Sequence, residues 1–293
     1  MKNKRFLYLV QSLPQLMRLG VTMAVTFSTA TGYIVIAGTI NSDFFLLLAG
    51  VFLLSGGASA LNQYQERETD VLMSRTCKRP IPSGKISALT GLLISLFLTF
   101  SGLLLLLIFA GYIPALLGLF NMLWYNGFYT YLKKKTAFAV VPGSLTGVTP
   151  VLIGWSAGGG SLIDPVIVFI AFFLYLWQIP HFWLLLIRFN NDYKKAGLGS
   201  LSSLFTENQS KRVVYSWVIG TTIASLFFPY FGIIKSNVLI VILLATSAWL
   251  SVSFYRIIFE KTKVIKLKKA FIVLNAYMII VLFLLILEFS AIK

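Results

Sequence analysis

The sequence is poor in charged residues, in acids and in cysteine, and each shortage excludes a class of protein. Only 12% of its 293 residues are charged, whereas a soluble domain carries roughly a quarter, so a soluble globular protein is excluded. The single cysteine, Cys77, cannot form an internal disulfide, and we assign it no role. Nine acids against 25 bases leave a formal charge of +16. In a soluble protein this excess would indicate nucleic-acid binding, but here it must first be weighed as a signal of membrane topology.

Apolar residues are abundant and occur in long runs. They make up 58% of the chain, and the mean hydropathy is +0.85. A membrane span needs about 20 mostly apolar residues, so we predict an all-α integral membrane protein that forms one membrane domain over residues 1–293. The nine predicted spans are residues 21–40, 44–63, 86–110, 113–131, 138–157, 164–187, 213–232, 237–255 and 270–290. The N-terminal segment has no apolar core that ends in a cleavage site, so we expect no removable signal peptide.

Lysine and arginine are concentrated at alternate connections between the predicted spans. The N-terminal segment carries four, and the connections after spans two, four, six and eight carry five, three, five and six. Only Lys235 and Lys293 fall on the other side. The positive-inside rule then predicts a cytoplasmic N-terminus and a C-terminus outside the cell. Topology therefore explains the net charge without nucleic acid.

The connection after span two, "NQYQERETDVLMSRTCKRPIPSGK", concentrates acids and bases. Asn62, Glu66 and Asp70 are spaced i, i+4, i+8, so they share one side if span two continues as a helix. Oxygen ligands of this kind suit Mg²⁺, which typically bridges one or two carboxylates to substrate phosphates. Arg75 and Arg79 on the same connection could hold the remaining phosphate charge. A solvated interfacial helix with internal ion pairs is the alternative.

Two further polar clusters fall on the same predicted side of the membrane. "RFNNDYKKAG" follows span six and contains one acid, Asp192, and "YLKKKT" follows span four and contains Lys133 and Lys134. Each cluster taken alone is typical of an ordinary surface or of an orientation signal. Together with the first motif, they outline a diphosphate site that opens from the cytoplasmic face.

The single histidine, His181, lies within predicted span six in "YLWQIPHFWLLLI". Pro180 beside it removes a helix hydrogen bond and favours a kink. Histidine can ligate iron or transfer protons, although a buried histidine that bonds a carbonyl is the commoner case. The neighbouring aromatic residues could pack, form an interface belt or shield a carbocation with their ring faces. They are Tyr175, Trp177, Phe182 and Trp183.

Six of these motifs, taken in order along the first two thirds of the chain, resemble the UbiA superfamily of intramembrane prenyltransferases. They are "NQYQERETD", "RTCKRPIPSG", "YLKKKT", "GVTPVLIGW", "WQIPHFW" and "DYKKAG". The pairing of "WQIPHFW" with "DYKKAG" resembles the branch of the family that prenylates heme. The last three spans match in hydropathy alone.

This resemblance implies a nine-helix bundle with a cavity open to the cytoplasm. It implies that the farnesyl group of farnesyl diphosphate joins a vinyl group of heme B, the second substrate. Water then supplies a hydroxyl group, and heme O and diphosphate are released. The carried-over catalytic and Mg²⁺-binding residues are Asn62, Glu66, Asp70 and Asp192. The carried-over diphosphate contacts are Arg75, Arg79, Lys133 and Lys134, and His181 is the candidate heme-binding residue.

The chain also departs from the family pattern. "RLG" stands where Lys-Pro-Arg is usual, so Arg18 alone would make that basic contact, and Asn191 replaces one acid of a pair beside Asp192. Ala139 stands where asparagine is common. Because Asn191 replaces an acid, a second metal site is in doubt.

Other functions stay open at this point. They are prenylation of an aromatic quinone precursor, a heme-binding assembly factor without turnover and, with less support, a transporter. The expected location is a bacterial plasma membrane with the active site toward the cytoplasm. Membrane lipid and a downstream heme oxidase are candidate partners.

Overall fold

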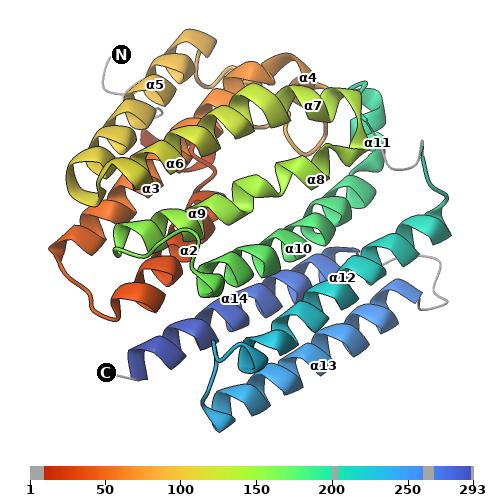
Figure 1. Ribbon diagram of the computed structural model, residues 1–293. Helices are drawn as coiled ribbons and strands as arrows, with labels where there is room; N and C mark the ends of the chain where they lie inside the picture. The colour runs from red at the N-terminus through yellow and green to blue at the C-terminus, as the bar shows by residue number, and fades with distance from the viewer. Residues whose placement is uncertain (1–9, 200–203, 260–266, 292–293) are drawn as a thin grey trace.

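The computed structural model describes residues 10–199, 204–259 and 267–291, and all regular structure within them is helical (Figure 1). Residues 10–16 form a helical segment before the first bundle helix. The elements that follow are α2 (Leu19–Ala37), α3 (Ser42–Gln65), α4 (Arg67–Val71), α5 (Ala88–Leu105), η1 (Leu106–Ala110), α6 (Tyr112–Met122), η2 (Leu123–Tyr129), α7 (Thr130–Lys135), η3 (Ala137–Ala139), α8 (Val140–Gly143), α9 (Leu145–Ala157), α10 (Pro165–Arg188), α11 (Asn190–Lys195), α12 (Glu207–Tyr230), α13 (Asn237–Phe259) and α14 (Leu267–Ala291). η1 and η2 are π-helical, and η3 is a 3-10 turn.

Eight helices of the described chain are long and apolar enough to cross a membrane, and they correspond to eight of the nine predicted spans. The remaining predicted span, residues 113–131, is the fourth in chain order and is helical as α6, η2 and α7. It is less apolar because it includes Asn121, Asn126 and several tyrosines. The membrane-spanning helical bundle is therefore confirmed, whereas the count of nine and the orientation stay predictions.

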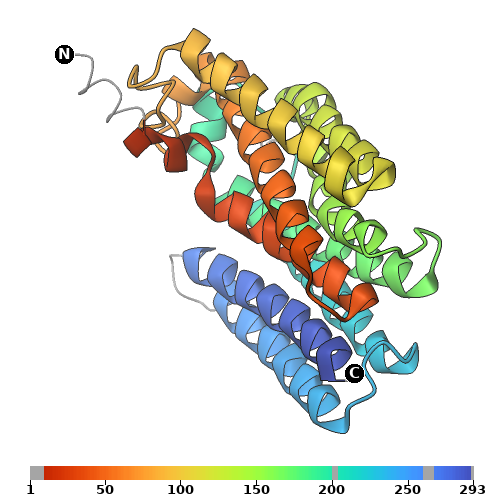
Figure 2. The same ribbon diagram turned by 90° about the vertical axis from the view of Figure 1, so that its left-hand side faces the viewer.

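The long helices form a ring in which the first and last pack together. α2 packs on α3 and α9, α3 on α5, and α6 on α9. The C-terminal half continues from α9 to α10, α12, α13 and α14, and α14 returns to α2 (Figure 2). The largest cluster of buried apolar side chains lies in this C-terminal half. The N-terminal half leaves room for a cavity.

Close approach of α2 and α9 depends on glycine. A Cβ atom at Gly154 would lie 1.9 Å from the carbonyl oxygen of Thr29, and one at Gly32 would lie 2.1 Å from that of Val151. Small residues at such crossings let membrane helices pack without a hydrophobic driving force. α5 instead exposes apolar side chains, including Phe97 and Phe100 at 70% each, as a lipid-facing helix does.

Most of the described bases, with the exception of Lys235 between α12 and α13, gather at one end of the bundle, which we call the basic end. It contains the connection of residues 66–87, the end of α7 and α11, which lie together in Figure 1. This clustering agrees with the predicted alternation of charge. Some of the counted bases lie outside the described residues: Lys2, Lys4, Arg5, Lys261, Lys263, Lys266 and Lys293.

Candidate functional site

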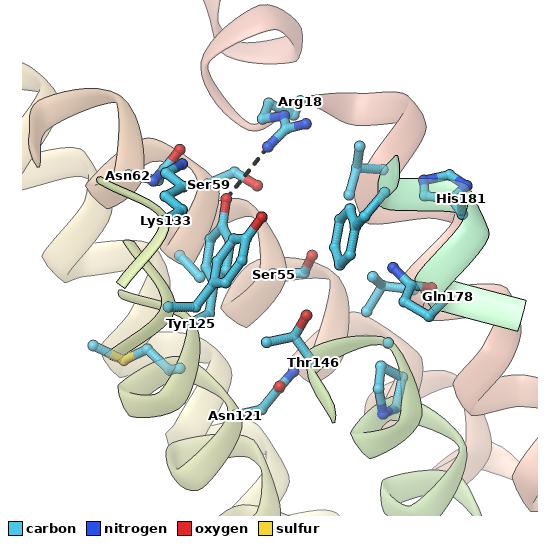
Figure 3. Close-up of a pocket in the computed structure, with 18 of the residues that line it drawn as sticks. Arg18, Ser55, Ser59, Asn62, Asn121, Tyr125, Lys133, Thr146, Gln178 and His181 are labelled. Carbon is cyan, nitrogen blue, oxygen red and sulfur yellow. Dashed lines mark hydrogen bonds between the residues drawn. The ribbon is translucent and has the colours of Figure 1, made fainter. Parts of the chain in front are cut away.

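A cavity of about 220 Å³ opens in the N-terminal half of the bundle. Its wall is built by α2, α3, α6, η2, α7, α8, α9, α10 and α11, together with the connection after α4. Figure 3 shows part of this wall. Of the residues predicted from sequence to bind metal, diphosphate or heme, six line the cavity: Asn62, Glu66, Arg75, Arg79, Lys133 and His181. Arg18, predicted as a further basic contact, and the aromatic Phe182 line it as well. Asp70, Asp192 and Lys134 do not.

Glu66 lies where α3 ends, and Lys133 of α7 neutralises it. The two side chains form an ion pair of 2.5 Å between Nζ and Oε1, and both are largely buried. The predicted continuous helix through Asn62, Glu66 and Asp70 is interrupted here, because Glu66 has φ −103° and ψ 8° and α4 begins at the next residue. The backbone bonds from Glu66 N to Asn62 O and from Asp70 N to Glu66 O are nevertheless retained. The three side chains therefore stay near one another despite the break.

Asp70 is fully buried behind the cavity wall, where it pairs with Arg79. Arg79 Nη1 donates to Asp70 Oδ2 at 2.7 Å, while the other carboxylate oxygen, Oδ1, has no hydrogen-bond partner. Burial raises the pKa of Asp70, and the Arg79 guanidinium opposes that rise. Arg79 itself lines the cavity, so the pair joins the buried acid to the site.

Asp192 ties α11 to the connection after α4. Its carboxylate accepts hydrogen bonds from Ser74 Oγ at 3.0 and 2.8 Å and from the Arg75 amide at 3.2 Å. Burial acts to raise the pKa of Asp192, but these bonds outweigh it and hold the pKa below its usual value. Asp192 therefore positions Arg75 rather than facing the cavity.

Arg75 is the cavity's least satisfied cation. Its guanidinium lies over the Phe189 ring, 5.0 Å from the centroid, and its Nε is buried without a partner. Burial lowers the pKa of Arg75. Because the Arg75 side chain lines the cavity, its guanidinium would attract an anion there. Lys134, by contrast, lies over the Tyr131 ring outside the cavity wall.

Carboxylates of the described chain do not form a ready-made metal site, since no three histidine, cysteine or acid side chains are grouped to hold an ion. One buried carboxylate oxygen, Asp70 Oδ1, has no hydrogen-bond partner, and Glu66 Oε1 is paired with Lys133 alone. Mg²⁺ usually binds one or two carboxylates and takes its other ligands from water and substrate phosphates. Asn62, Glu66 and Asp70 fit this donor set, whereas Asp192 is already occupied by hydrogen bonds.

The wall opposite this ion-pair cluster is aromatic and polar. His181 lies on α10, which continues through Pro180 and ends at Arg188, and its ring lies 4.8 Å from those of Trp177 and Phe271. Gln178 lies one turn away on the same helix (Figure 3). Tyr129 stacks on Phe182 at 5.8 Å, so aromatic faces close this side.

Sequence reasoning missed several residues of the cavity wall. η2 brings in Tyr125 and Tyr129, and π-helical turns often occur at functional sites. Tyr125 accepts a hydrogen bond of 3.3 Å from Arg18 (Figure 3). Among the described residues other than glycine, only Arg18 has a positive φ, of 51°, a strained conformation that is common at functional sites. The spacing of Asn121, Tyr125 and Tyr129 by four residues was the available signal.

Sequence comparison relates the chain to enzymes of one activity. It is 34% identical over 226 residues to a protoheme IX farnesyltransferase from Nitratidesulfovibrio vulgaris. The aligned segment covers 77% of this chain and 79% of the relative. It is 35% identical over 210 residues to a protoheme IX farnesyltransferase from Geobacter sulfurreducens, covering 70% and 76%. The resemblance to prenyltransferases is thereby confirmed.

Solved structures agree in fold. A UbiA homolog from Archaeoglobus fulgidus bound to GPP and Mg²⁺ superposes with a TM-score of 0.73 at 16% identity, covering 96% of this chain and 99% of that one. A structure on the biosynthesis of digeranylgeranylglyceryl phosphate synthase in membranes gives a TM-score of 0.76 at 19% identity, with the same coverage. Residues 25–287 match the UbiA prenyltransferase family. The chain therefore belongs to the UbiA prenyltransferase family.

Proposed function

We propose that this prenyltransferase joins the farnesyl group of farnesyl diphosphate to a vinyl group of heme B, adds water, and releases heme O and diphosphate. The observation that carries the proposal is one cavity with an ion-pair cluster on one side and His181 among aromatic rings on the other. The relatives named protoheme IX farnesyltransferase support heme as the acceptor.

The cations of the cavity would bind and activate the diphosphate. Arg75, Arg79 and Lys133 line the wall and bring three positive charges to it. Ionisation of the allylic C–O bond leaves both bonding electrons on the diphosphate oxygen. Fixed cations stabilise that developing charge more in the transition state than in the ground state. Lys133 and Arg79 can shift from their acids toward the diphosphate as it binds.

Mg²⁺ would be held by Asn62, Glu66 and Asp70 together with diphosphate oxygens. When bound, it neutralises phosphate charge and so assists departure of the leaving group. Asp192 would act indirectly, by fixing the connection that carries Arg75. Mg²⁺ in the Archaeoglobus fulgidus homolog supports this assignment.

The acceptor would lie against α10. The rings of Phe182 and Tyr129 give this wall apolar faces that can shield an allylic cation and exclude bulk water. His181 faces the position that the proposal gives to heme. The charge pattern favours a site that opens toward the cytoplasm of a bacterial plasma membrane, and a downstream heme oxidase would consume the product.

Protein in lipid nanodiscs, supplied with heme B, farnesyl diphosphate and Mg²⁺, tests the proposal. Mass spectrometry should detect hydroxyethylfarnesyl heme from the unaltered chain and little from Glu66→Gln. The matched control is Glu68→Gln, because the Glu68 side chain is 84% exposed and pairs only with Arg67 in the described structure. Folded protein that yields no farnesylated heme would refute the proposal.

A further inference from the structure

The cavity contains an uncharged polar group that the diphosphate site does not use. The side-chain amide of Gln178 lines the cavity and forms no hydrogen bond to the part of the chain that the structure describes. It presents both a donor and an acceptor without net charge. Such a group suits a neutral ligand better than a diphosphate or a carboxylate. Water is the smallest ligand of this kind.

Gln178 and His181 are three residues apart on α10, and both line the cavity (Figure 3). Side chains at this spacing are neighbours, about 5–6 Å apart between Cβ atoms. One water with two hydrogen bonds of roughly 2.8 Å can bridge such a pair. Nδ1 of His181 is buried without a hydrogen-bond partner, so a ligand in the cavity would bind at Nε2. The Asn275 side chain also lies within hydrogen-bonding reach of the ring, so such a ligand would share the ring with Asn275.

The surroundings would keep such a water isolated. Val51, Leu54 and Ile153 line the same cavity with apolar surface. A water in an apolar chamber is retained where it has two to four polar partners. The turn of α10 with Gln178 and His181 provides two of them. The cavity can therefore hold an ordered water near the α10 wall.

We propose that Gln178 positions the water that becomes the hydroxyl group of the product, and that His181 accepts the proton released. The inference rests on the proposed function. In the first step, the vinyl π electrons form a bond to C1 of the farnesyl group, and diphosphate leaves with the electron pair of the C–O bond. Positive charge then resides on the vinyl carbon attached to the porphyrin. The water oxygen held by Gln178 bonds to that carbon, and one water proton passes to Nε2 of His181.

The position of the water matters because the carbocation attached to the porphyrin can also react without water. Loss of a proton from the adjacent carbon gives an alkene that is lighter than the hydroxylated product by one water. The ratio of hydrated to dehydrated product therefore reports where the water lies. A residue that acts only on folding or on heme affinity would change the total yield and leave this ratio unaltered.

Two variants disturb the amide in different ways. Gln178→Met keeps the side-chain length and removes both hydrogen-bonding groups. Gly147→Ala keeps Gln178 but displaces it, because a Cβ atom at Gly147 would lie 2.5 Å from Oε1 and 2.6 Å from Cδ of that side chain. The end of the glutamine side chain is flexible, so it can move without disrupting the backbone. The matched control is Asn121→Leu, which removes another unpartnered amide of the wall that has no histidine beside it.

The assay supplies heme B, farnesyl diphosphate and Mg²⁺ in ¹⁸O-labelled water and measures both products by mass spectrometry. We expect label in the hydroxyl group, and we expect both Gln178→Met and Gly147→Ala to lower the hydrated-to-dehydrated ratio roughly tenfold, the factor for one lost hydrogen bond. Asn121→Leu should not change the ratio. An unchanged ratio in both test variants would overturn the inference, as would an equal fall in the control. If the unaltered chain makes no farnesylated heme, the proposed function fails first and the inference with it.

Discussion

Removing Arg79 should destabilise the protein strongly, because the buried Asp70 would lose the ion-pair partner that stabilises its charge. The two side chains are 16% and 0% exposed, and 2.7 Å separates Arg79 Nη1 from Asp70 Oδ2. Asp70 Oδ1 already has no hydrogen-bond partner. Loss of one partner of a buried ion pair typically costs about 3–5 kcal/mol. At the lower end, this loss corresponds to a fall of roughly 6–12 °C in the unfolding temperature.

Thermal unfolding of Arg79→Met in detergent, followed by tryptophan fluorescence, measures this loss. Arg67→Met is the control, since Arg67 pairs with the exposed Glu68 at the surface and such pairs contribute about 0–1 kcal/mol. The double variant Arg79→Met/Asp70→Asn should recover much of the loss, because it leaves no buried charge. If Arg79→Met and Arg67→Met unfold at the same temperature, the reasoning about Asp70 is wrong.

Three other changes have definite expected outcomes. Ser74→Ala removes the hydrogen bond that the Ser74 hydroxyl shares between the two carboxylate oxygens of Asp192. It should raise KM for farnesyl diphosphate roughly tenfold, whereas heme affinity measured by spectral titration should not change. Lys133→Met should lower kcat/KM in steady-state assays at least tenfold. The control variant Lys134→Met should leave kcat/KM near the unaltered value, since Lys134 lies outside the cavity wall. Equal effects of the two variants would contradict the role given to Lys133. Gly154→Leu should abolish folded protein in size-exclusion chromatography, because even a Cβ atom would overlap the Thr29 carbonyl; a normal elution profile would show that α2 and α9 can separate.

The membrane bundle was predictable because hydropathy and charge placement act along the chain. Apolar runs identified eight spans that the structure bears out. The same rule predicted a span at residues 113–131, but three polar side chains of this segment, Asn121, Tyr125 and Tyr129, line the cavity. A span that lines a polar site is less apolar than one that faces lipid on all sides.

The pairings within the site were not predictable, because they join residues far apart in the sequence. Spacing placed Asn62, Glu66 and Asp70 on one side of a helix, yet the helix breaks at Glu66, where Lys133 pairs with it. Likewise, nothing near Asp192 in sequence indicates that Ser74, 118 residues away, is its partner. Spacing along one helix can predict which residues share a face, but it cannot predict which distant side chain will pair with an acid on that face.

Competition between acceptors tests the central claim most directly. The lipid-reconstituted protein is given farnesyl diphosphate and Mg²⁺ with heme B and an aromatic acid together, and the prenylated products are quantified by mass spectrometry. Our account predicts hydroxyethylfarnesyl heme with little or no prenylated aromatic acid. Prenylation of the aromatic acid without farnesylated heme would contradict it and would assign the cavity to a quinone precursor.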